Sequence, residues 1–78
     1  MKYYIETIEQ IKDSEGAISE YAKVEQKSDL NLALSAYYAK LANVAADLDK
    51  NHTYMNIKIV DSLSGVVKYD SIGDYVEE

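Results

Sequence analysis

The chain has 78 residues and a formal charge of −6, because 14 Asp and Glu residues face only eight Lys and no Arg. It contains eight Tyr but no Cys, Phe, Trp or Pro. This length corresponds to a single domain, residues 1–78. The lack of Cys excludes a disulfide framework, and the acidic, Arg-free composition argues against direct binding to nucleic acid.

Residues 2–26 predict a β-hairpin. Aromatic and branched residues alternate with polar ones at its start, and the turn sequence DSEG ends at Gly16. The alternative is a helix, because Tyr4, Ile8 and Ile11 also fit helical spacing. We prefer the hairpin because the consecutive Tyr and Ile residues favour strands and because Gly16 lies where a hairpin turns.

Residues 28–50 predict one long amphipathic helix. Large apolar residues recur at alternating spacings of four and three, which places them on one stripe of a helix opposite a polar side. We expect Ser28 to cap the N-terminus and Asn51 to end the helix in the left-handed conformation. The stripe that we expect to be buried against a sheet consists of Leu30, Leu34, Tyr37, Leu41, Val44 and Leu48.

Residues 54–71 predict a second hairpin, and residues 72–78 an acidic C-terminal tail. The expected fold is therefore α+β, in the order β-β-α-β-β, with one antiparallel four-stranded sheet and the helix packed on one face. The alternation of side chains predicts Ile57, Ile59 and Val67 beneath the helix. The residues expected on the other face are Tyr4, Ile8, Tyr54 and Val60.

The polar residues form no recognisable catalytic or metal motif. His52 is the single imidazole and has no nucleophile motif around it, so we expect its ring to help end the helix. The sequence from Asp47 to Asn51 matches the start of an EF-hand, but His52 stands in place of the required Gly and Lys58 in place of the bidentate Glu. We therefore expect no metal, no cofactor and no enzymatic activity.

Three segments resemble small acidic proteins encoded by phages and mobile elements of low-GC Gram-positive bacteria. They are KYYIE at residues 2–6, DLNLAL at residues 29–34 and VDSLSGVVK at residues 60–68. The resemblance covers the layout of most of the chain and transfers no functional residue. Because some of these proteins are anti-CRISPR proteins, the resemblance implies an inhibitor of host defence.

Acidic residues are densest near the C-terminus, which fits either an ordinary solvated tail or an acidic arm that meets a basic groove. Tyr is the other unusually frequent residue and is enriched in interface cores. We expect a small acidic binding protein that blocks a basic surface of a nucleic-acid-handling enzyme; the alternative is a structural or self-associating subunit. The candidate partner-binding residues are Asp70, Asp74, Glu77, Glu78, Tyr4, Tyr38, Tyr54 and Tyr75.

The expected fold also predicts self-association. One helix covers only one face of a four-stranded sheet, so we expect a homodimer or small symmetric oligomer through the other face or a free edge. No apolar run is long enough to cross a membrane, and nothing near Met1 resembles a signal peptide. We therefore expect a cytoplasmic protein with no membrane partner.

Overall fold

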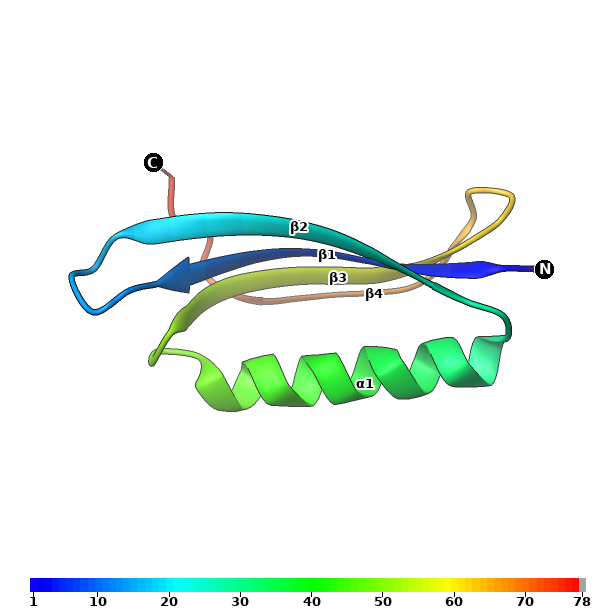
Figure 1. Cartoon of the computed structure of the whole chain (residues 1–78), viewed down its shortest axis with the longest axis horizontal. Helices are drawn as coiled ribbons and strands as arrows, with labels where there is room; N and C mark the ends of the chain where they lie inside the picture. Colours follow the sequence, from blue (N-terminus) through cyan, green and yellow to red (C-terminus); the bar gives the residue numbers. More distant parts are fainter. Residues whose placement is uncertain (78) are drawn as a thin grey trace.

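The computed structural model describes residues 1–77 and confirms the predicted α+β architecture. Four antiparallel strands form one sheet in the order β2-β1-β3-β4, and helix α1 lies along one face of it (Figure 1). The helix contacts β1, β2 and β3. The bounds of the elements are β1 Tyr3–Lys12, β2 Ile18–Lys27, α1 Leu30–Asp47, β3 His52–Asp61 and β4 Val66–Gly73.

Both hairpin turns are organised by an Asp side chain. In the β1–β2 turn, Asp13 Oδ1 accepts hydrogen bonds from the backbone N–H groups of Glu15 and Ala17, at 2.8 and 2.9 Å. In the β3–β4 turn, Asp61 Oδ1 accepts bonds from two backbone N–H groups in the same way, both at 2.9 Å. Short Asp side chains stabilise turns by such local bonds, which explains why the chain reverses at these two points.

Helix α1 is shorter at both ends than predicted. The N-cap is Asp29 and not Ser28, because Asp29 has the extended backbone of a capping residue and its side chain accepts the Leu32 N–H at 2.9 Å. At the other end Leu48 is extended, and Asp49 rather than Asn51 takes the left-handed conformation, with a φ of 66°. The helix therefore ends at Asp47, three residues before the predicted end at residue 50.

The core lies between the helix and the two central strands. Of the predicted helix stripe, Tyr37 and Val44 are buried, whereas the four Leu residues are only half-buried. Ala33 is fully buried, so the helix approaches the sheet through a small residue as well as through the stripe. The strand residues that complete the apolar core are Ile5, Met55, Ile57 and Ile59.

The prediction that Val67 is buried is wrong. The register between β3 and β4 shifts at this point: Ile59 pairs with Lys68, whereas Val60 pairs with Val66. Val67 is therefore the extra residue of a β-bulge and is exposed. The bulge places Lys68, not Val67, on the helix-covered face of β4.

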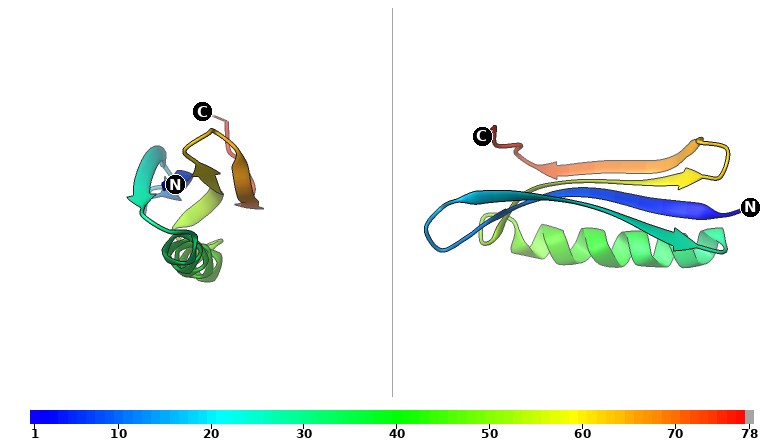
Figure 2. Two further views of the ribbon diagram at one scale, coloured as in Figure 1. Left: turned by 90° about the vertical axis from the view of Figure 1, so that its right-hand side faces the viewer. Right: turned by 45° about the horizontal axis from the view of Figure 1, so that its top comes forward.

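The chain after β4 does not extend away as a tail. Strand β4 continues to Gly73, beyond the predicted end at residue 71, and Gly73 has a φ of 77°. The Asp74 N–H then donates to the Thr53 carbonyl at 2.9 Å. Residues 74–77, which we call the C-terminal strap, lie on the side of the sheet opposite the helix (Figures 1 and 2). Within residues 1–77, no helix is both long and apolar enough to span a membrane.

Candidate protein-binding site

The two ends of the molecule differ in charge. The β1–β2 turn, the end of α1 with the loop after it, and the C-terminal strap all lie at one end of the long axis (Figures 1 and 2). These three segments carry six carboxylates and two Lys, Lys12 and Lys50, so together they have a net charge of 2 − 6 = −4. We call this region the acidic end. Its carboxylates are Asp13, Glu15, Asp47, Asp49, Asp74 and Glu77.

Hydrogen bonds between backbone groups hold the three segments together. The Lys12 N–H, at the end of β1, donates to the Asn51 carbonyl in the α1–β3 loop at 2.6 Å. The bond from Asp74 to Thr53 attaches the strap to the start of β3. The acidic end is therefore built on a fixed backbone, which reduces the conformational entropy that its carboxylates would lose on binding.

Gln10 fastens the C-terminal strap to the sheet. Its side chain is almost fully buried, with 1% of the residue exposed. Gln10 Nε2 donates to the Val76 carbonyl at 2.7 Å, and the Val76 N–H donates to Gln10 Oε1 at 2.8 Å. One amide side chain thus satisfies both backbone groups of Val76. Beside it, the rings of Tyr54 and Tyr75 meet edge to face with their centroids 5.3 Å apart.

The structure brings four of the predicted partner-binding residues together. Asp74 and Glu77 are exposed on the strap, and the Tyr54–Tyr75 ring pair lies next to them. An aromatic pair beside carboxylates offers both contact area and charge to a partner. Glu78 lies outside the described residues.

Asp70 is not part of the acidic end, although the sequence grouped it with the C-terminal acids. It lies on the helix-covered side of β4, where its carboxylate accepts a hydrogen bond from the Tyr37 hydroxyl. Burial of Tyr37, together with the bond to Asp70 and its negative charge, raises the pKa of the Tyr37 hydroxyl. Asp70 therefore has a partner inside the fold that satisfies the polar tip of a core side chain.

Tyr38 and Tyr4 also lie away from the acidic end. Tyr38 is exposed on α1, packs edge to face on Tyr37 at 5.4 Å, and has Lys68 Nζ 5.5 Å from its ring centroid. Tyr4 pairs with Val60 near the opposite end of the sheet. The eight predicted partner-binding residues therefore do not form one surface.

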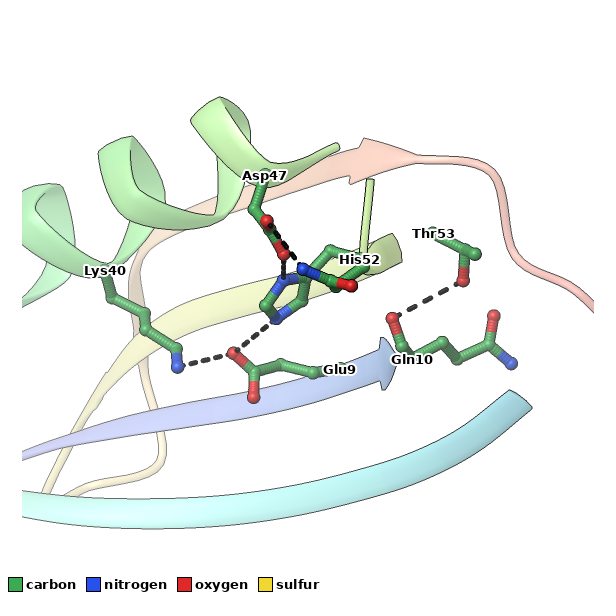
Figure 3. Close-up of polar contacts among 7 residues, drawn as sticks. Glu9, Gln10, Lys40, Asp47, His52 and Thr53 are labelled. Atoms are coloured by element: carbon green, nitrogen blue, oxygen red, sulfur yellow. Dashed lines mark hydrogen bonds and ion pairs between the residues drawn. The ribbon is translucent and has the colours of Figure 1, made fainter. Parts of the chain in front are cut away.

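A second polar cluster joins the end of α1 to the sheet (Figure 3). His52 Nδ1 lies 2.6 Å from Asp47 Oδ2, and His52 Nε2 lies 3.7 Å from Glu9 Oε1. Lys40 Nζ reaches the same Glu9 oxygen at 2.5 Å. The hydrogen bond from His52, together with a weaker one from Asn51, holds the pKa of Asp47 below its usual value.

This cluster has a structural explanation. Both ring nitrogens of His52 face carboxylates, one from the helix and one from β1, so the ring links two elements. The neighbouring Thr53 hydroxyl donates to the Gln10 carbonyl at 3.4 Å and does not contact the ring. Among residues 1–77, no group of three or more His, Cys, Asp or Glu side chains is arranged to hold a metal ion.

Sequence reasoning missed most of the acidic end. Asp13 and Glu15 were recognisable only as turn residues, and Asp47 and Asp49 only as a failed EF-hand match. No local signal relates these segments to the C-terminus, because backbone bonds between residues far apart in sequence bring them together. Gln10 was also missed, since nothing in the alternation of β1 distinguishes it from a solvated polar residue.

Comparison with known proteins finds no matching family model, no similar curated protein and no similar solved structure.

Proposed function

We propose that this chain is a small non-enzymatic binding protein whose acidic end covers a basic surface of a nucleic-acid-handling enzyme. The observation that carries the proposal is that three segments with six carboxylates lie at one end of the molecule, the end at which Tyr54 and Tyr75 form a ring pair. Enzymes that act on nucleic acid bind phosphates through Lys and Arg. A compact group of carboxylates competes with phosphates for such side chains.

In the proposed mechanism, the carboxylates speed association and the aromatic side chains select the partner. Carboxylates on a fixed backbone attract the basic surface over distances of about 10 Å at 0.1 M salt, which speeds association. Charge alone does not select a partner, so the exposed Tyr75 and the half-buried Tyr54 provide contact area at the centre of the interface. The resemblance to phage and mobile-element proteins favours a defence nuclease, such as a CRISPR effector, as the enzyme that is inhibited.

The test is inhibition of DNA cleavage by purified CRISPR effector nucleases. The variant D49N/D74N/E77Q removes three charges from the acidic end and leaves the hydrogen bonds of Asp13 and Asp47 in place. We expect at least a tenfold loss of inhibition, since three charge contacts of about 0.5–1 kcal/mol each sum to more than about 1.4 kcal/mol.

A matched control removes three negative charges from the other half of the molecule. In E6Q/E25Q/D61N the net charge changes by the same amount, and the side-chain amide oxygen introduced by D61N can still accept the turn hydrogen bonds. We expect this control to inhibit as well as the unaltered protein. Equal losses in both variants would reject the acidic end as the binding site, and absence of binding to every nuclease tested would reject the partner class.

A further inference from the structure

The sheet face opposite α1 is a second surface, separate from the acidic end. The strand register places three rows of four side chains on it, between the strap and the far end of the sheet. We call these rows the open face. Several of its side chains are well exposed, among them Val24 at 64% and Tyr69 at 54%. The apolar members of the open face are Tyr4, Ile8, Ala22, Val24, Val60, Val66 and Tyr69.

The open face is electrically neutral on a strongly acidic protein. It has two charged members, Glu6 and Lys58, whose Oε1 and Nζ atoms lie 3.7 Å apart. Its other polar members, Gln26, Asn56 and Ser71, are uncharged. A face that attracted a basic partner would be acidic, whereas a neutral apolar face matches a surface of the same kind. Another copy of this chain supplies such a surface at equal concentration.

The area and the surface shape of the open face fit a weak association between two copies of the chain. Four strands about 4.8 Å apart and three rows about 6.7 Å apart give a flat footprint of roughly 400 Å² per copy, before side-chain relief is added. Interfaces that bury less than about 1,200 Å² in total are weak or transient. A hollow of about 380 Å³, lined by Glu6, Ile8, Asn56, Lys58, Val66 and Tyr69, leaves room for inserted side chains.

From this we infer that a second copy of the chain packs on the open face, forming a two-fold symmetric dimer with the two sheets face to face and the helices outside. We expect this dimer to be weak, because interfaces of such a small area are weak or transient. This inference does not depend on the proposed inhibition of an enzyme.

The strap determines the orientation of the two copies. Gln10 and Tyr54 hold it over one end of the sheet, on the same side as the open face. If both strap ends pointed the same way, the two straps would occupy the same space between the sheets. The two-fold axis therefore lies across the strands, and the strap ends point in opposite directions. This arrangement also separates the two acidic ends and leaves both free for a partner.

Sedimentation equilibrium between 5 and 500 μM tests the dimer directly. We expect the mass to rise from 8.8 kDa toward twice that value. We also expect association to hold or strengthen in 0.5 M NaCl, since salt screens the repulsion between two chains of −6, whereas binding through the acidic end weakens. A constant mass of one chain up to 500 μM would overturn the inference, whatever the outcome of the nuclease assay.

The variant I8K/V24K places two cations on the open face and lowers the magnitude of the net charge to 4, so general repulsion decreases. We expect it to remain monomeric at 500 μM. Its control, L32K/A39K, makes the same charge change at exposed positions of α1 and is expected to dimerise normally. Equal dimerisation of both variants would overturn the assignment of the interface.

Dilution of the unaltered protein, followed by amide NMR shifts, tests the interface without relying on any variant. We expect the largest shifts on the open face of the two central strands, including residues 6, 8 and 58. Shifts that are largest along the outer edge of β2 or β4 would indicate edge pairing and overturn the inference.

The lack of native Cys makes the orientation measurable with one spin label at S14C in the β1–β2 turn. Ser14 is eight residues from Glu6 in the middle row, or about 26 Å along an extended strand. The proposed orientation therefore places two labels roughly 50 Å apart. A distance below about 30 Å would mean that the acidic ends lie together and would overturn this orientation.

Discussion

The two faces of the sheet are built from the same strands and differ in what covers them. On one face Ile57 and Ile59 are fully buried beneath α1. On the other face Ile8 and Val24 keep 42% and 64% of their surface exposed, although they too are aliphatic residues in alternating strands. Alternation therefore identifies residues that share a face, whereas burial depends on the element that packs against that face.

Truncation of one aliphatic residue on each face gives the largest expected contrast. We expect I57A to lower the free energy of unfolding by about 3 kcal/mol, because it leaves a cavity beneath the helix. V24A removes an exposed side chain and is expected to change it by less than about 0.5 kcal/mol. Urea unfolding, measured at protein concentrations at which the chain is monomeric, checks both values. If I57A does not fold, I57V should still lower the free energy of unfolding by about 1 kcal/mol. Similar losses of unfolding free energy in I57A and V24A would contradict the expected difference between the two faces.

The strap lies on the same side of the sheet as the open face, and its path depends on the backbone at Gly73. A Cβ built there would lie 2.3 Å from the Thr53 carbonyl oxygen, in addition to the strain of a φ of 77°. We expect G73A to destabilise the fold by about 2 kcal/mol. G16A is the control, because Gly16 has a similar φ of 86° but open space around its Cβ position, and about 1 kcal/mol is expected. A loss for G16A as large as that for G73A would show that the close contact is unimportant.

Replacement of Gln10 tests the attachment of the strap to the sheet. We expect Q10A to lower the free energy of unfolding by about 1–2 kcal/mol, since both bonds to Val76 are lost. Hydrogen exchange at the Val76 amide should accelerate at the same time. Q26A, at an exposed position of β2, should leave both measurements unchanged. Unaltered protection of Val76 in Q10A would mean that other contacts hold the strap.

The smallest expected effect concerns pH and the helix-covered face. Because the folded protein holds the pKa of Asp47 below that of the unfolded chain, its ionised form stabilises the fold above about pH 4. This contribution is lost as the pH falls through the lowered pKa. We expect the stability difference between the unaltered protein and D47N to shrink from pH 6 to pH 2 in urea unfolding. A difference that stays constant would contradict the role of the Asp47–His52 bond.

Local patterns were sufficient for the elements but not for their ends. Large apolar residues at alternating spacings of three and four predict a helix whichever residue it begins at, so α1 was recognisable from the sequence. Ser28 and Asp29 are both good capping residues, and the choice between them depends on where the chain becomes extended after β2. The bulge that exposes Val67 is likewise a property of the pairing between β3 and β4, which no single strand reveals.

The candidate site was predictable only in part. The C-terminal acids and the abundant Tyr residues pointed to Asp74, Glu77, Tyr54 and Tyr75, which the structure places side by side. Asp70 belongs with Tyr37 instead, because the side chain of a core Tyr needs a partner for its hydroxyl. Proximity in sequence therefore misgrouped Asp70, since neighbouring residues of a strand point to opposite faces.

The sequence by itself determined the order of the strands and the helix along the chain and, except at the bulge in β4, the residues that share each face, because both follow from periodicity within short segments. Only the tertiary structure decided that the chain after Gly73 returns over the sheet and that three distant segments share the acidic end. The physical reason is the separation of the interacting groups. The hydrogen bonds that hold the strap join Gln10 to Val76, which are 66 residues apart in sequence. No pattern within a short segment predicts that these two residues bond to each other.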